Sequence, residues 1–264
     1  MKGIRSIIPC TFIFVTILFS ACNKKEGCTD PQASNYDPDA NKDAGCEYNY
    51  PVEMHFHPYV NDTAHLEGAT YTIGGVRTQL NYTRFYVSHP RLIDAAGNET
   101  PAPIQYLLVL PEPDDYAIGD MPPGDYTGIR FEIGVGDSAV NHGDPSLYEI
   151  GDPLGAQFPS MHWGWSVGYI FLRIDGVTDT NGDNVPETGF EMHLGTEAYL
   201  TTITIDYPIT IGEGQENIFH LNANWDRIFD GINLAVDHTT HTTDNLILAG
   251  QIQDNLFNFI EPED

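Results

Sequence analysis

The strongest constraint on the fold is a repeated alternation of apolar and polar residues with a period of two. Residues 52–57 read Val-Glu-Met-His-Phe-His, so that every second side chain is apolar. Such alternation places the apolar side chains on one face of a β-strand and the polar ones on the other. Similar runs occur at residues 80–92, 104–110, 126–135, 169–174, 190–194, 200–211 and 217–223, and turn sequences separate them. Residues 50–264 are therefore predicted to form one all-β domain, an antiparallel β-sandwich or barrel-like fold, with short helices at residues 225–230 and 245–260.

The charge of the chain is strongly negative. Asp and Glu number 38 against 11 Lys and Arg, which gives a formal net charge of −27. A chain this acidic repels a phosphate backbone, so no nucleic-acid partner is expected. Hydrophobic residues make up 41% of the chain, which argues against disorder.

The first 21 residues have the pattern of a signal peptide. Lys2 and Arg5 precede an apolar run over residues 7–19, which is too short to span a bilayer comfortably. The small residues before Cys22 resemble a bacterial lipobox, although Phe19 stands where Leu is usual, and the alternative is plain secretion with a spare cysteine. We therefore expect an exported protein that is lipidated on Cys22 and anchored in the outer membrane, facing the periplasm or the cell surface. The lipid is expected to be its only contact with the membrane.

Residues 22–49 are predicted to form a tether and a small disulfide-closed module. Cys10 leaves with the signal peptide and Cys22 carries the lipid, which leaves Cys28 and Cys46 as a natural pair in an oxidising compartment. A disulfide closing such a loop stabilises the fold by roughly 3 kcal/mol in the chain-entropy model. The segment resembles a module of exported Bacteroidetes proteins that is usually written G-C-T-D-P-x-A-x-N-Y-x-P.

Two clusters of oxygen-bearing side chains are candidate calcium sites. Alternating oxygen ligands are typical of calcium loops. One cluster lies in the small module and the other in the main domain; they comprise Asp37, Asp39, Asn41 and Asp43, and Asp179, Asn181, Asp183 and Glu187. The alternatives are a solvated spacer for the first cluster and a hairpin tip for the second.

Histidine is the residue type that points to transition-metal chemistry. The chain has ten histidines, and His55 and His57 face the same side of one predicted strand, roughly 6.5–7 Å apart. This spacing allows both to bind one metal ion or each to enter a different site. With no free thiol expected, imidazole ligands suit copper, zinc or nickel. Three histidines directly follow a methionine, but adjacent strand residues face opposite sides, so these methionines are expected in the core.

A longer segment resembles a known family of copper-binding proteins. Residues 158–176 read FPSMHWGWSVGYIFLRIDG. This closely resembles the central motif M-x-W-x-W-x-S-G-Y-x-F-L-x-x-E-G of MbnP-like proteins, although residues 166–168 depart from the usual Asn or Gln followed by Ser-Gly. Residues 83–92, 123–131 and 190–195 resemble further motifs of that family in the same order, with His89 replacing an Asn. The resemblance spans about residues 52–235.

The resemblance implies copper binding outside the cytoplasm through histidines and sometimes through a tryptophan oxidised to kynurenine. A diheme protein of the cytochrome c peroxidase type would be the maturation partner. Trp163 and Trp165 are the matching tryptophans, and their alternative role is ordinary aromatic packing. Four histidines are the first-choice copper ligands and two are second choices: His55, His57, His162 and His193, then His142 and His241.

Signatures of enzymes are largely missing from the sequence. It has no G-x-S-x-G, no P-loop and no H-E-x-x-H. We therefore expect a lipid-anchored, non-enzymatic copper-binding protein that serves copper acquisition or handling. The alternative is a calcium-stabilised cell-surface β-sandwich that binds a glycan or a protein. A metal-dependent oxidoreductase or hydrolase has no positional support.

Overall fold

The computed structural model describes residues 24–164 and 166–263. The predicted signal peptide, Cys22 and Trp165 lie outside the described residues. The chain divides into two compact units, Met1–Tyr48 and Asn49–Asp264. Each unit is considered by itself.

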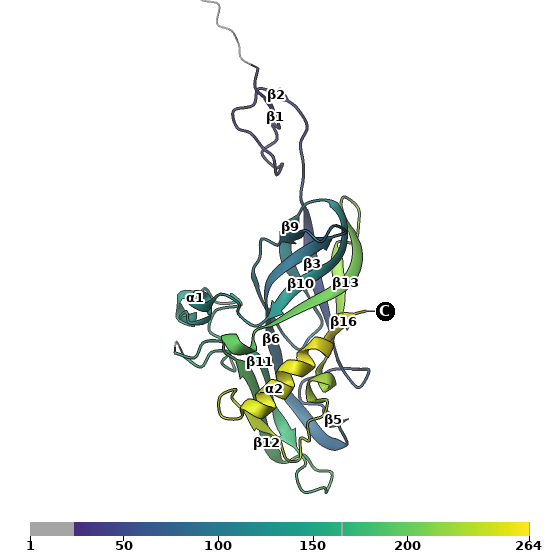
Figure 1. Cartoon of the computed structure of the whole chain (residues 1–264), viewed down its shortest axis with the longest axis vertical. Helices are drawn as coiled ribbons and strands as arrows, with labels where there is room; N and C mark the ends of the chain where they lie inside the picture. The colour runs from purple at the N-terminus through teal and green to yellow at the C-terminus, as the bar shows by residue number, and fades with distance from the viewer. Residues whose placement is uncertain (1–23, 165, 264) are drawn as a thin grey trace, which may run out of the picture. The chain divides into compact units, whose positions relative to one another are not determined.

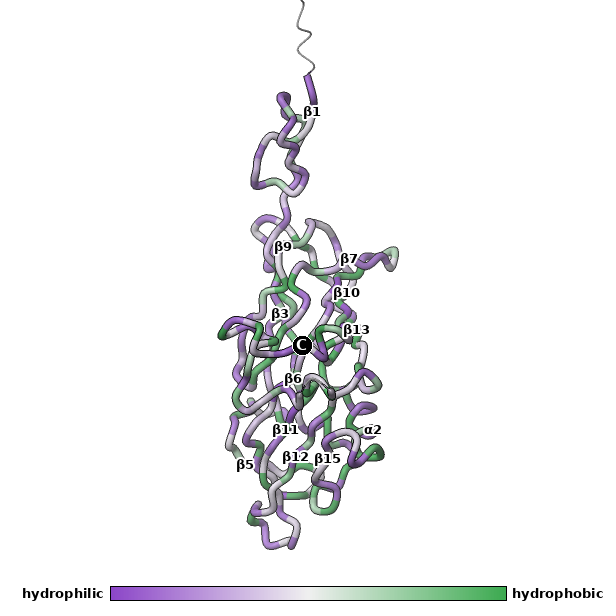
Figure 2. The backbone as a smooth tube through the Cα atoms, turned by 90° about the vertical axis from the view of Figure 1, so that its left-hand side faces the viewer, coloured by the Kyte–Doolittle hydropathy of each residue, from purple (hydrophilic) through white to green (hydrophobic). Residues whose placement is uncertain are grey.

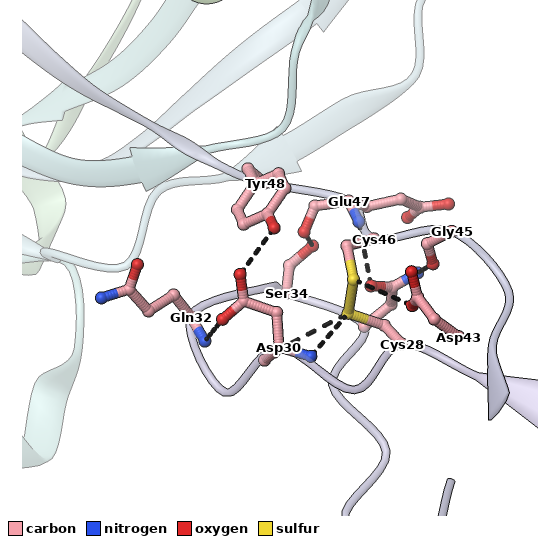
Figure 3. The surroundings of a disulfide bond; sticks show 10 residues. Cys28, Asp30, Gln32, Ser34, Asp43, Gly45, Cys46, Glu47 and Tyr48 are labelled. Carbon is pink, nitrogen blue, oxygen red and sulfur yellow. Dashed lines mark hydrogen bonds between the residues drawn. A yellow bond between two sulfur atoms is a disulfide. The ribbon is translucent and has the colours of Figure 1, made fainter. Parts of the chain in front are cut away.

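The first unit is a small loop-rich module held by one disulfide. Cys28 and Cys46 are joined, as predicted, and their Cα atoms lie 4.9 Å apart. Two short strands, β1 (Glu26–Gly27) and β2 (Lys42–Asp43), pair in parallel. The carboxylate of Asp30 accepts a hydrogen bond from the Tyr48 hydroxyl at 2.7 Å (Figure 3). Figure 2 shows this module as a mostly hydrophilic tube, so the covalent bridge takes the place of a large apolar core.

The second unit is an all-β sandwich, as the alternation predicts (Figure 1). Within residues 49–164 and 166–263, one sheet has nine strands in the order β13-β10-β6-β11-β12-β15, and β5, β7 and β8 also pair with β6. Its strands are β5 (Thr70–Ile73), β6 (Val76–Asp94), β7 (Glu99–Pro101), β8 (Tyr106–Val109), β10 (Gly124–Ile133), β11 (Ile170–Thr178), β12 (Thr188–Gly195), β13 (Thr201–Ile211) and β15 (Thr239–Thr240).

The other sheet of the same described region has five strands in the order β16-β14-β3-β4, with β9 also paired to β3. They are β3 (Tyr50–Val60), β4 (Thr63–Ala64), β9 (Asp114–Met121), β14 (Ile218–Asn224) and β16 (Ile260–Pro262). The sheets are not wholly antiparallel, because β14 runs parallel to β3 and β15 parallel to β12. The apolar–polar alternation along a strand is the same whether the neighbouring strand runs parallel or antiparallel. The sequence pattern therefore could not predict these two parallel pairs.

The inner faces of the two sheets meet in one apolar core. From β3, Met54 and Phe56 point inward and are almost fully buried. Phe56 meets Phe85 of β6 edge to face, with ring centroids 5.6 Å apart. Met192 of β12 also belongs to this core, as expected for the methionines that precede histidines. The residues between these positions, including the histidines of β3, therefore lie on the outer faces of the sandwich.

The connection between β10 and β11 covers part of the outer face of the nine-stranded sheet. Residues from this connection and from the strands beneath it form a second apolar cluster, which includes Tyr86, Met161 and Tyr169. The connection contains a short helix, α1 (Ser138–Asn141), and a 3-10 turn, η1 (Pro145–Leu147). Since Tyr86 lies between two core residues of β6, this cluster is on the opposite face of the sheet from the main core.

The other helical segments lie near the C-terminal end, where the sequence predicted them. They are η3 (Trp225–Phe229), α2 (Leu246–Asn255) and η4 (Leu256–Asn258). A 3-10 turn between β12 and β13, η2 (Glu197–Tyr199), was not predicted. The α2 helix packs against β12 and contributes Leu248 and Ile252 to the core (Figure 1). No helix in the described part of the chain is both long and apolar enough to cross a membrane.

The buried His65 generates a prediction about stability at acid pH. Its Nε2 lies 2.9 Å from the Thr83 hydroxyl, and burial lowers the pKa of His65 from 6.5 to about 4. The unfolded chain binds this proton more readily than the folded one. Its stabilisation is therefore complete above about pH 6.5 and is lost as the pH falls toward 4, by up to ~3 kcal/mol of unfolding free energy. We expect His65→Gln to have a flatter unfolding free energy between pH 7 and 4 than the unmodified protein in denaturant titrations. Parallel curves for the two proteins would contradict this role.

Candidate metal centres

His193 is oriented as a metal ligand on the outer face of the nine-stranded sheet. Its Nε2 lies 2.5 Å from the Asp175 carboxylate, whose other oxygen accepts a hydrogen bond from Arg173 at 2.7 Å. The Nδ1 atom of His193 is buried and has no hydrogen-bond partner among the described residues. A carboxylate that holds one ring nitrogen fixes the ring and leaves the lone pair on the other nitrogen for a metal.

The charge of this arrangement is set by Asp175. Burial raises the pKa of Asp175, but hydrogen bonds from His193 and Arg173 more than offset this, so that the pKa lies below its usual value. The carboxyl is therefore ionised at neutral pH. An ionised partner raises the basicity of the histidine ligand that it holds.

Trp163 and His241 lie next to His193. The Trp163 and His193 ring centroids are 6.3 Å apart, and those of His193 and His241 are 5.0 Å apart. Trp163 packs so closely on Gly195 that a Cβ there would lie 2.6 Å from the indole ring. The glycine of the 190–195 motif therefore makes room for the tryptophan of the 158–176 motif.

His241 has a carboxylate beside each of its two ring nitrogens. Its Nδ1 lies 2.8 Å from Asp244 and its Nε2 lies 2.9 Å from Glu191. The hydrogen bond to Asp244 raises the pKa of His241 above 6.5. Burial lowers this pKa and the hydrogen bond to Glu191 raises it, so the net shift is upward. His241 therefore has to release a proton and one carboxylate partner before it can bind a metal.

His162 directly precedes Trp163 and is held by the backbone of the same segment. Its Nδ1 accepts a hydrogen bond from the Gly164 amide at 3.0 Å, so in the neutral ring the proton lies on the buried Nε2, which has no hydrogen-bond partner within 3.5 Å in the described structure. His162 therefore has to move this proton and give up the Gly164 hydrogen bond before Nε2 can bind a metal. Burial lowers the pKa of His162, which keeps the ring neutral. His142 lies on the same β10–β11 connection and contacts Glu197 through Nε2 at 2.8 Å.

A second group of histidines lies on the outer face of the five-stranded sheet. His55 and His57 share this face of β3, as the alternation predicts, and the parallel pairing sets His220 of β14 beside His55. The ring centroids are 4.2 Å apart for His55 and His57, and 5.4 Å apart for His55 and His220. Metal-ligating atoms of His57, His220 and Glu263 all lie within 4.8 Å of one another.

The four first-choice copper ligands therefore do not form one centre. The histidines of β3 lie outside one sheet and His193 lies outside the other, since both strands direct methionines into the core between the sheets. The sequence also missed His220 and Glu263. The alternation around Phe219 and Leu221 could have placed His220 on an outer face, but nothing in it shows which strand lies alongside.

The predicted calcium loop of the main domain forms a tight turn. The carboxylate of Asp179 accepts hydrogen bonds from the backbone N–H groups of Asn181, Gly182 and Asn184, at 2.7–3.1 Å. The Asn181 amide donates to Asp183 and Glu187 at 3.2 and 3.0 Å. These contacts are those of the alternative, a hairpin tip, and calcium binding there stays a prediction.

The oxygen cluster of the small module surrounds a lysine. The Lys25 ammonium lies 2.9 Å from Asp37 and 3.3 Å from Asp39, and its backbone N–H donates to Asn41. The hydrogen bond from Lys25 lowers the pKa of Asp37. An ammonium group thus already balances part of the negative charge for which calcium was predicted, while Asp43 lies beside Cys46.

Comparison with known proteins identifies the family. A structure of MbnP from Methylosinus trichosporium is similar at 18% identity and a TM-score of 0.49, over 69% of this chain and 78% of that one. No curated protein matches the sequence. The family model MbnP matches residues 49–245, about three quarters of the chain and nearly all of its β-sandwich. The chain therefore belongs to the MbnP family, a family associated with copper handling.

Proposed function

We propose that this protein binds copper outside the cytoplasm without catalysing a reaction, and that His193 is the central ligand. The observation that carries the proposal is the unpartnered, buried Nδ1 of His193, whose ring Asp175 holds in place. This histidine lies on the 190–195 motif strand and faces the tryptophan of the 158–176 motif. A fixed imidazole with an unused nitrogen is the arrangement that metal-binding histidines have.

Further ligands come from the neighbours of His193. His241 lies 5.0 Å from His193 between two carboxylates, and His162 adjoins Trp163, the ring that faces His193. Imidazole nitrogen suits copper well, and the cysteines of the described module are locked in a disulfide. We propose His193 and His241 as ligands, with His162 and His142 of the β10–β11 connection as further candidates that would have to move to reach the ion.

Trp163 is the candidate for oxidation. Its ring packs on Gly195 and lies 6.3 Å from His193, so kynurenine formed there would place new polar groups beside the metal. The MbnP resemblance supports this proposal, and it supports a diheme partner of the cytochrome c peroxidase type as the source of the oxidation. Trp165 is the other tryptophan of the motif.

The proposed location is outside the cytoplasm, with a lipid on Cys22 as anchor. The signal-like N-terminus and the lipobox-like sequence support it. The net charge of −27 supports a role in gathering cations, because a strongly negative surface raises their local concentration. The competing role as a calcium-stabilised binder of glycans or proteins predicts scattered histidines, whereas these histidines gather in groups.

Replacing His193 tests the central ligand. His193→Ala is expected to weaken copper affinity by at least about 100-fold, beyond the 10–100-fold typical of outer-shell partners, because it removes a direct ligand. The measurement is titration of the apo-protein with Cu(I) and Cu(II) against a competing chelator. His89→Asn is the matched control, since His89 is paired with Glu132 at 2.6 Å and has a backbone φ of 49° that Asn tolerates. An equal loss in both variants would count against His193.

Replacing Asp175 tests how His193 is held. Asp175→Asn keeps the shape of the side chain but removes the charge that orients the imidazole. Copper affinity should fall by about 10–100-fold, with the stoichiometry unchanged. Unaltered affinity would show that the carboxylate serves only the ion pair with Arg173.

The proton on His241 gives the site a characteristic pH dependence. Because the pKa of His241 is raised, protons compete with copper already above pH 6.5, and affinity should fall as the pH is lowered from 8 to 5. In His241→Gln the decline should begin at lower pH, with weaker binding at pH 8. Affinities of the two proteins measured at fixed ionic strength provide the comparison. Curves that differ by a constant factor over the whole range would exclude His241 as a ligand.

A further inference from the structure

A row of polar side chains crosses four neighbouring strands on the outer face of the five-stranded sheet. Asp115 of β9 is the register partner of His55 on β3, and His55 is the partner of His220 on β14. Glu263 follows β16 and donates its backbone N–H to the His220 carbonyl at 3.0 Å. His57 lies two residues beyond His55 on the same face, so five acidic and imidazole groups meet at one place.

Three of these groups have the spacing of metal ligands. A Glu263 oxygen lies 3.2 Å from His57 Nε2 and 3.7 Å from His220 Nδ1. Ligand atoms around a tetrahedral zinc ion, at bond lengths of 2.0–2.1 Å, lie about 3.3 Å apart. The structure therefore needs little movement of these side chains to enclose an ion.

Within the described residues, neither of these two nitrogens makes a hydrogen bond, although both lie within ion-pair distance of Glu263. His57 Nε2 and His220 Nδ1 are buried and lack a hydrogen-bond partner in the described part of the chain. A buried polar atom without a partner is costly, and two of them directed at one carboxylate oxygen are expected where a cation binds.

Carboxylates hold the far sides of two rings. Asp115 contacts His55 Nδ1, which leaves Nε2 of that ring for a metal. Glu216 lies 3.4 Å from His220 Nε2, on the opposite side of the ring from Nδ1. Both contacts repeat the carboxylate–histidine arrangement that orients metal ligands.

We propose that His57, His220 and Glu263 form a second metal site, with His55 as the fourth ligand, and that this site takes Zn²⁺. Three imidazoles and one carboxylate suit zinc in tetrahedral geometry. A hard carboxylate is a poor ligand for Cu(I), and calcium or magnesium requires mostly oxygen ligands. The bound ion would join β3, β14 and the segment after β16, and so fix the C-terminal strand to the sheet.

This site is independent of the copper site proposed around His193. The histidines concerned lie outside opposite sheets, with the apolar core of the sandwich between them. The two sites can therefore be removed separately, and the failure of one proposal leaves the other standing.

The test is metal titration of the full mature chain after removal of all metals. Co²⁺ serves as a spectroscopic probe because tetrahedral Co²⁺ absorbs strongly in the visible range, and Zn²⁺ should displace it and raise the melting temperature. The double variant His57→Gln with His220→Gln should lose the Co²⁺ spectrum and weaken zinc binding by at least about 100-fold. Glu263→Gln is the milder variant, because the side chain is 39% exposed and the backbone hydrogen bond to His220 does not depend on it.

The controls separate the two proposals. His89→Asn should bind Zn²⁺ as the unmodified protein does. His193→Ala should lose copper and any zinc bound at that site, but keep the Co²⁺ spectrum and the zinc binding that depend on His57 and His220. Circular dichroism of the apo-variants establishes that they fold. Unchanged zinc affinity in the double variant and in Glu263→Gln would overturn the zinc site, and so would loss, in His193→Ala, of the zinc binding that depends on His57 and His220. The copper proposal is judged on copper affinity in His193→Ala.

Discussion

The strict alternation of side chains along the strands is the constraint on which the rest of this structure depends. Because the two inner faces are filled by residues such as Met54, Phe56 and Met192, every polar neighbour is forced onto an outer face. This keeps the histidines of β3, β12 and β14 out of the core and also divides them. The same physical rule thus produces both a dry sandwich and two separate groups of imidazoles on its outside.

Carboxylates organise both groups. The chain is so acidic that imidazoles on the outer faces of its sheets commonly meet an Asp or a Glu, as His193 meets Asp175 and His55 meets Asp115. Such contacts fix which ring nitrogen carries the proton and turn the other nitrogen toward a neighbour. The net charge therefore acts locally, by orienting ligands, as well as over distance, by attracting cations.

The two outer faces are built differently, and this affects what each site does. The β10–β11 connection brings Trp163 beside His193, whose own side chain is only 6% exposed. The five-stranded sheet places its histidines directly on neighbouring strands, where an ion would serve to join the strands. A site beside an oxidisable ring would suit copper, while a site that links neighbouring strands would suit a structural ion.

The sequence by itself determined the all-β class, most strand positions, the Cys28–Cys46 disulfide and the shared face of His55 and His57. These follow from local chemistry, because alternation and turn residues act within a few positions of the chain. The small turns and short strands escaped prediction because their patterns are too brief to be distinctive. The eight-residue β9 was also missed, because only two of its residues are buried and its alternation is weak. Only the tertiary structure decided that β14 lies parallel to β3, which brings His220 beside His55 across more than half of the chain. It also decided that His193 lies on the opposite side of the core, because pairing and sheet packing depend on long-range contacts that a period of two cannot encode.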